Sequence, residues 1–155
     1  MKKIIISPFS RPLRNGLPNA KDYPYWEDVI KILHENNIHT TQIGVDKERQ
    51  LSTNEYKFNC TFEELEKLVL SSDTWVSVDN FFPHFCNTIN KRGIVIFGKS
   101  DPNIFGYKEN INLLRDRKYL RPDQYNVWEG VECDSECFVN PKTIITTIQG
   151  VLNVN

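Results

Sequence analysis

The 155 residues of this sequence are the length of one ordinary domain, long enough to bury a hydrophobic core. The chain is 39% hydrophobic and 25% charged, close to a typical soluble globular composition. Its 19 basic and 20 acidic residues give a net charge of −1, which argues against a broad basic surface for nucleic acid. Any anion would have to be bound by a few local Lys and Arg residues.

Targeting and metal-binding signals are weak in this sequence. No apolar run approaches the ~20 residues of a membrane span, and the apolar run after Met1 is too short for a signal peptide, so we expect a cytoplasmic protein. Reduced thiols are expected in that compartment. Cys133 and Cys137 supply two ligands where structural zinc needs four, and the histidines show no matching spacing. We predict no metal site and no cofactor.

The first predicted strand, Lys2–Ser7, leads into a long proline-rich loop over residues 8–24. The loop carries Ser10, Arg11 and Lys21 at the carboxyl end of that strand. Two interpretations stay open, a solvated loop with scattered positive charge and a phosphate-binding loop. An amphipathic helix is predicted next, over Tyr25–Asn36.

A second strand is predicted over Ile38–Ile43 and is closed by Gly44. Asp46 and Glu48 follow this strand, where an acid can accept hydrogen bonds from a ribose, although solvated acids are commoner on protein surfaces. Thr61 and Glu64 have the spacing of a capping box, which predicts a helix to about Ser71.

The segment from Thr74 to Pro102 predicts a strand–helix–strand unit. Its strands are Thr74–Val78 and Ile94–Phe97, with a short helix beginning near Pro83. Ligands of open α/β sheets bind beyond the carboxyl ends of the strands. The polar residues in those places are Asp79, Asn80 and His84 after the first strand and Ser100 and Asp101 after the second.

The remaining sequence is less regular. Asn110–Leu114 is a candidate strand, Arg115–Arg121 is interpreted as a solvated basic turn, and Tyr125–Val131 has no assignment. A last helix, Pro141 to about Val151, has Asn140 at its N-cap. The alternation of strands and helices predicts a single α/β domain over 1–155, with a Rossmann-like parallel sheet of about five strands and helices on both faces.

Four segments in this order resemble the C-terminal half of heptosyltransferase-type glycosyltransferases (family 9). They are Pro8-Phe9-Ser10-Arg11, Lys21-Asp22-Tyr23-Pro24, Ser77-Val78-Asp79-x-x-x-x-His84 and Ile96-Phe97-Gly98-x-Ser100-Asp101-Pro102. The resemblance implies a GT-B fold, in which this half binds the nucleotide-sugar. It places Ser10 and Lys21, beside Arg11, at the donor pyrophosphate, Glu48 near the ribose, and the Asp79–His84 turn, including Asn80, at the phosphates. Ser100 and Asp101 complete the implied site.

The sequence departs from that family in two respects. The small Ser-Gly after the aspartate is replaced by Asn80-Phe81-Phe82, which suggests an aromatic wall or a buried wedge instead of a close backbone approach to phosphate. The acceptor half, which supplies the family's catalytic base, has no counterpart in the sequence. We therefore expect a lone donor-binding half, and whether it is an enzyme stays open.

Three functions are compatible with these features. The first is a glycosyltransferase-like module that binds a nucleoside diphosphate sugar and works with a separate acceptor-binding partner. The second is a non-catalytic protein that binds or sequesters a nucleotide, and the third is a structural protein. Retention of the site residues argues against the third. Five aromatic residues also predict an exposed surface for self-association or a partner chain; they are Phe81, Phe82, Phe85, Phe105 and Tyr107.

Overall fold

The sheet has six parallel strands in the order β3-β2-β1-β4-β5-β6. It is seen in a computed structural model that describes residues 1–153. The parallel Rossmann-like sheet predicted from the sequence is confirmed, with one strand more than expected. The strands are β1 (Lys3–Ser7), β2 (His39–Gly44), β3 (Glu55–Phe58), β4 (Thr74–Val78), β5 (Ile94–Phe97) and β6 (Ile111–Leu114).

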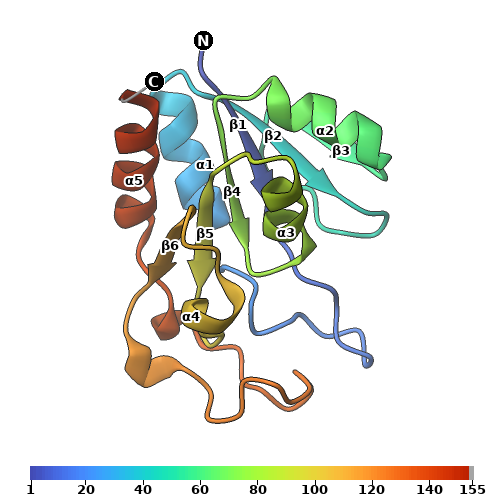
Figure 1. The fold of residues 1–155 in the computed structure, drawn as a ribbon, viewed down its shortest axis with the longest axis vertical. Coiled ribbons are helices and arrows are strands. Elements are labelled where there is room, and N and C mark those ends of the chain that lie inside the picture. Colours follow the sequence, from blue (N-terminus) through green and yellow to red (C-terminus); the bar gives the residue numbers. More distant parts are fainter. Residues whose placement is uncertain (154–155) are drawn as a thin grey trace.

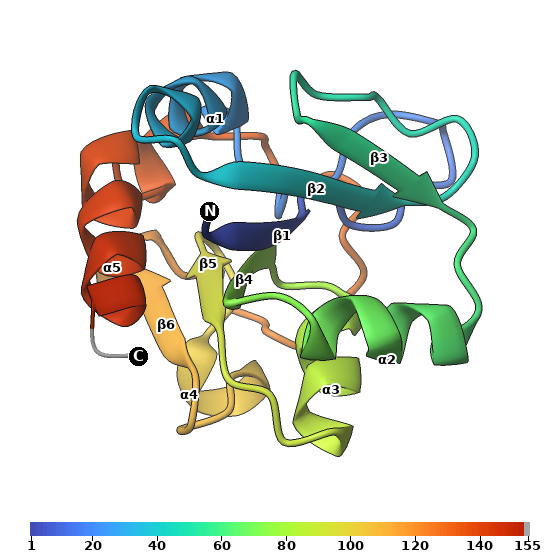
Figure 2. The same cartoon turned by 90° about the horizontal axis from the view of Figure 1, so that it is seen from above.

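Helices cover both faces of the sheet, as Figure 2 shows. The helices α1 and α5 lie on one face, and α2 and α3 lie on the other. The helices are α1 (Trp26–Glu35), α2 (Phe62–Leu70), α3 (Phe81–Thr88), α4 (Pro102–Phe105) and α5 (Pro141–Asn153). Two short 3₁₀ turns, Arg117–Tyr119 and Ser135–Cys137, lie between β6 and α5. Within residues 1–153, no helix combines the length and apolarity that a membrane crossing needs.

The central strands are apolar on both faces because both faces are covered. In β1, Ile4 and Ile6 pack into the core beneath α1 and α5, whereas Ile5 packs into the core beneath α2 and α3. Successive side chains of a strand point to opposite faces, so an unbroken isoleucine run suits only a strand buried on both sides. The same reasoning covers β4 and β5, whose residues are all buried.

The predicted starts of α2 and α5 are confirmed by their caps, whereas α3 begins at Phe81, two residues before the start expected near Pro83. Thr61 accepts from the backbone N–H of Glu64, whose side chain accepts from the N–H of Thr61 in return. Asn140 accepts from the N–H of Thr143 at the start of α5. Each such cap satisfies backbone donors that a helix cannot pair internally.

The strand β3 and the helix α4 were not predicted. The sequence of β3, Glu-Tyr-Lys-Phe, contains no apolar run, and each of its residues is exposed or half-buried. The four residues of α4 are too few for a helical period.

The strand order places a topological switch point between β1 and β4. From β1 the chain moves outward to β2 and β3, and then returns to place β4 on the other side of β1. The carboxyl ends of the strands point downward in Figure 1, where the loop after β1 and the segment after β6 gather below them. Crevices at such points are the usual ligand sites of open α/β sheets.

Candidate functional site

The side chain of Asn80 joins the ends of β1 and β4 at the switch point. Its Nδ2 group donates to Ser7 Oγ at 2.9 Å and to the carbonyl oxygen of Phe9 at 3.0 Å. Its Oδ1 accepts from Ser77 Oγ at 3.0 Å and from the N–H of Phe82 at 2.9 Å. The amide group has two donors and two acceptor positions, so these four bonds use all of its capacity. Its predicted contact with a phosphate stays a prediction.

The two phenylalanines after Asn80 take different positions. Phe82 is fully buried, with its ring edge-on to the indole of Trp75 at 5.4 Å between centroids. Phe81 remains 54% exposed at the start of α3. The expectation of a buried wedge therefore holds for Phe82. The predicted aromatic surface loses Phe82, and Phe85, Phe105 and Tyr107 are half-buried.

The loop after β1 is anchored by Ser10 and Asp22. Ser10 is buried; its hydroxyl donates to the carbonyl oxygen of Asp79 at 3.1 Å, and its N–H donates to Asp22 Oδ1 at 2.7 Å. Burial raises the pKa of Asp22 to about 6, although the backbone N–H donors and the Lys21 ammonium oppose the rise. The loop thus carries a half-buried carboxyl directly beside the lysine predicted to bind phosphate.

Lys21 lies over the switch point among groups from three parts of the chain. Its Nζ atom is 3.4 Å from Asp79 Oδ2, and the two side chains are only 20% and 10% exposed. The same ammonium lies 5.0 Å from the ring centroid of Trp128, and the guanidinium of Arg121 stacks on that indole at 3.7 Å. Lys21 therefore lies between the carboxylate of Asp79 and the indole of Trp128, and Arg121 stacks on the same indole.

Arg121 holds its own segment together. Its guanidinium donates to three carbonyl oxygens, those of Gln124, Asn126 and Val127. Its Nε group is buried and has no hydrogen-bond partner among residues 1–153. Arg117 forms a bidentate pair with Asp101, at 3.0 and 2.7 Å. Arg115, Arg117 and Lys118 are exposed, as expected of a solvated basic turn, whereas Arg121 is half-buried and holds its own segment, which the sequence did not indicate.

Glu48 borders a small pocket at the ends of β1 and β2. The pocket has a volume of about 80 Å³ and is lined by Phe9, Gly44, Lys57, Leu65 and Phe81 among others. Burial, and then the nearby Asp22, raise the pKa of the Glu48 carboxyl. A Cβ on Gly44 would meet Glu48 Oε2, so the glycine leaves room for this carboxylate over the end of β2.

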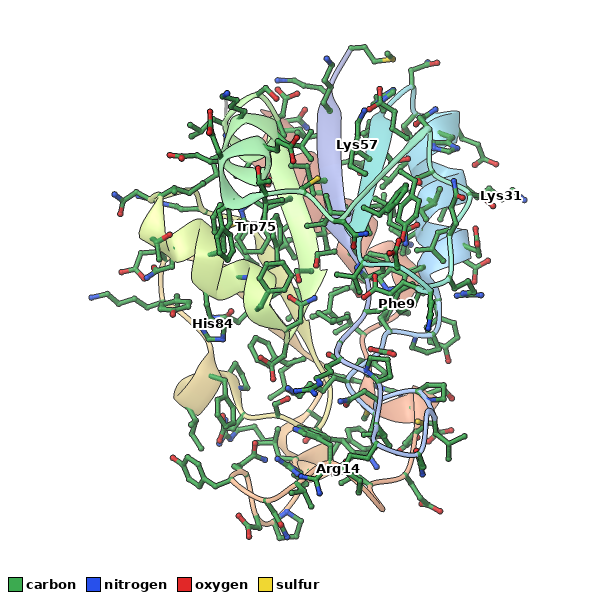
Figure 3. All side chains as sticks on the ribbon, turned by 90° about the vertical axis from the view of Figure 1, so that its right-hand side faces the viewer. Phe9, Arg14, Lys31, Lys57, Trp75 and His84 are labelled. Atoms are coloured by element: carbon green, nitrogen blue, oxygen red, sulfur yellow. The ribbon has the colours of Figure 1, made fainter. Side chains whose placement is uncertain are left out.

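The other predicted residues have different surroundings. His84 is exposed on α3, and its Nδ1 lies 2.8 Å from the hydroxyl of Tyr107. Arg11 is exposed, and Ser100 is buried. Asp101 caps α4 through the N–H of Asn103, and its hydrogen bonds with Arg117 hold its pKa below the usual range. Figure 3 shows Phe9 and Arg14 on the loop after β1 and His84 apart from them, on α3.

The structure thus brings Ser10, Lys21 and Asp79 together and sets Glu48 at a neighbouring pocket. It separates Ser100 and Asp101 into the loop after β5, where Asp101 has structural partners. Sequence reasoning missed Asp22, Arg121 and Trp128. The signals available were an acid beside the candidate lysine and a tryptophan in a segment without a regular pattern.

No family model and no curated protein sequence matches this chain. Its fold does match solved structures. A glycosyl transferase family 9 protein from Veillonella parvula aligns with a TM-score of 0.72 at 13% identity, over 99% of this chain and 47% of the other.

Two Escherichia coli structures match similarly. Heptosyltransferase WaaC with ADP aligns with a TM-score of 0.66 at 13% identity, over 97% of this chain and 44% of its own. ADP-heptose lps heptosyltransferase II aligns with a TM-score of 0.65 at 15% identity, over 97% and 46%. The chain spans less than half of each of these proteins. The glycosyltransferase-like fold expected from the sequence motifs is confirmed, with the extent of one half of a GT-B protein.

Proposed function

We propose that the chain binds a nucleoside diphosphate, free or as a nucleotide-sugar, at the carboxyl ends of β1, β2 and β4. The observation that carries this proposal is the position of Lys21 at the switch point, between Asp79 and the Trp128 indole on which Arg121 also stacks. A diphosphate is negatively charged and would complement the positive charge of Lys21 and Arg121. Charge-assisted bonds to phosphate are among the stronger hydrogen bonds in proteins.

Lys21 is the residue proposed to contact the phosphates. Its 3.4 Å separation from Asp79 is longer than an ordinary charge-assisted hydrogen bond, so the ammonium can turn toward a phosphate oxygen at little cost. Arg11, exposed on the same loop, is the second cation available there. Glu48 would accept from the ribose hydroxyls beside the 80 Å³ pocket.

An adenine nucleotide is the first ligand to test. The fold neighbours include a heptosyltransferase with ADP and an ADP-heptose heptosyltransferase. On this basis the proposed donor class is an ADP-sugar, and a transfer reaction would need an acceptor-binding partner and a catalytic base.

A non-catalytic role in binding or sequestering the nucleotide is the second candidate. It is favoured by the placement of His84, the one histidine near the site in sequence. Its Nδ1 is engaged by the Tyr107 hydroxyl, and the two rings lie edge to face at 5.4 Å. This arrangement suits a residue that braces α3 rather than one that removes a proton from an acceptor.

Titration calorimetry with ADP, UDP and GDP tests the proposal. Replacement of one charge-assisted contact of about 1.5–3 kcal/mol should weaken binding by about tenfold or more in Lys21→Ala. The control is Lys31→Ala, an exposed lysine on α1, which should bind like the wild type. His84→Ala should weaken binding less than Lys21→Ala if His84 only braces its helix.

The melting temperature must be measured in the same variants. An exposed loop would predict no change for Lys21→Ala, but Lys21 is largely buried against Asp79, so we expect a measurable decrease. If a nucleotide binds the wild type and neither the Lys21 nor the His84 variant changes its affinity, the site lies elsewhere. If no nucleotide binds at millimolar concentration, the proposed function is wrong.

A further inference from the structure

The free edge of β3 carries a charge pattern that is complementary to itself. Within residues 1–153, β3 pairs with β2 alone, so its other edge is open. The N–H of Asn59 donates to the carbonyl oxygen of Gly44 on β2. Residues alternate along a strand, so Glu55 and Lys57 direct their backbone groups toward β2, whereas Tyr56 and Phe58 direct theirs outward.

The surroundings of this edge are partly apolar. An open groove of about 660 Å³ runs between the edge and α2, lined by Tyr56, Phe58 and Leu68 among others. Phe58 is 54% exposed and Phe62, at the start of α2, is 72% exposed. Exposed edges with apolar flanks are the usual place for a further strand to pair.

We propose that β3 pairs with β3 of a second copy, antiparallel and with the two-fold axis at Tyr56. In this register Tyr56 faces the partner's Tyr56, and the two exchange their outward backbone hydrogen bonds. Glu55 then lies opposite the partner's Lys57, and Lys57 opposite the partner's Glu55. These are non-hydrogen-bonded pairs, in which side chains approach most closely.

The charges select this register over the alternatives. Only the outward-facing residues can exchange backbone hydrogen bonds, so the other two-fold axes within the strand lie at Glu55, Lys57 and Phe58. An axis at Glu55 places two glutamates opposite each other. An axis at Lys57 places two lysines opposite each other, and an axis at Phe58 places Lys57 opposite Asn59, with no opposite charge. Charged residues on a short edge strand generally oppose pairing. Here the register centred on Tyr56 is the one in which both charges of each strand meet an opposite charge across a closed symmetric contact.

The charged residues of the proposed contact share one face of the sheet. Glu55 and Lys57 lie on the same face of β3, with Lys57 Nζ 3.6 Å from Glu55 Oε2. The register that pairs Ile43 with Lys57 places this face toward α2, since Ile43 packs against that helix. The strand has four residues, so the contact is small and the dissociation constant should be high, on the order of 0.1 mM.

Two charge-reversal variants test the inference. Glu55→Lys gives a chain with two positive residues on the edge, and Lys57→Glu gives a chain with two negative ones. Each should self-associate at least about tenfold more weakly than the wild type, because like charges replace both opposite-charge pairs. Mixed together, the two variants should form a heterodimer, because every pair across the axis is again opposite.

Sedimentation equilibrium of each chain alone, and of the mixture with one variant fluorescently labelled, measures all three affinities. Mixing cannot rescue a chain that fails to fold, so heterodimer formation separates charge repulsion from damage to β3. The control is a mixture of Lys31→Glu and Glu35→Lys, exposed residues of α1 over the other face of the sheet, which should not associate more than the wild type.

The inference is overturned by any of three results. One is a wild-type chain that stays monomeric at about 1 mM, well above the expected dissociation constant. Another is self-association that neither variant weakens. The last is a mixture of the two variants with no heterodimer.

Discussion

Removal of the Asn80 side chain should destabilise the fold more than removal of any ordinary helix cap. Asn80→Ala deletes the cap of α3 and leaves Ser7 Oγ and the carbonyl oxygen of Phe9 without their donor. A lost cap costs about 1 kcal/mol, and each buried group left unpaired costs about 1 kcal/mol or more. The free energy of unfolding should therefore fall by about 2–4 kcal/mol. For a chain of this length that corresponds to a melting temperature lower by roughly 4–16 °C.

Urea unfolding followed by circular dichroism measures this difference, with two comparison variants. Asn80→Ser keeps a hydroxyl to cap α3 but loses both Nδ2 bonds, so its loss should be intermediate. Asn140→Ala removes only a cap, at the exposed start of α5, and should cost about 1 kcal/mol. If Asn80→Ala and Asn140→Ala are equally stable, the bonds between the ends of β1 and β4 contribute nothing, and the reasoning fails.

Three further outcomes can be checked by unfolding experiments. Since burial raises the pKa of Asp22 to about 6, the native state holds a proton that the unfolded state releases near pH 4, and stability from this group is lost as the pH rises between these values. The free energy of unfolding of Asp22→Asn, relative to that of the wild type, should therefore rise from pH 4 to pH 7. A fall in this difference over the same range would contradict the reasoning. Gly93→Ala places a methyl group against the Trp75 indole and should cost about 1–3 kcal/mol, whereas Gly150→Ala, with open space on α5, should be neutral or stabilising. Asp101→Ala should destabilise more than Arg117→Ala in thermal melts, since only Asp101 also caps α4; equal losses would assign everything to the ion pair.

The buried parts of the fold were predictable from local sequence. The strands β1 and β5 contain continuous apolar runs, and β4 is rich in β-branched and aromatic residues; only a sheet covered on both faces buries such strands along their length. The strand β3 was not predictable, because its place in the sheet depends on pairing with β2 and not on burial of its own residues.

The candidate site was predictable only in part. Ser10, Lys21 and Asp79 each follow a strand, so a parallel sheet brings them to one edge. The contact of Trp128 with Lys21 joins positions more than a hundred residues apart, and the stacking of Arg121 on Trp128 depends on how an irregular segment folds back on itself. The full use of the Asn80 amide was also hidden, because two of its four partners belong to the end of β1 and the loop that follows.

The central position of β1 has a consequence for how the chain folds. This strand pairs with β2 on one side and with β4 on the other, and the backbone N–H of Lys3 donates to Asp73, 70 positions away. Contacts so distant in sequence slow folding, because a long loop must close before they form. On a ribosome that adds about 5–20 residues per second, β1 would wait roughly 4–14 s for β4 to be made. During that interval the isoleucines of β1 have at most β2 as a neighbouring strand, so this segment of the nascent chain is open to aggregation until β4 is made.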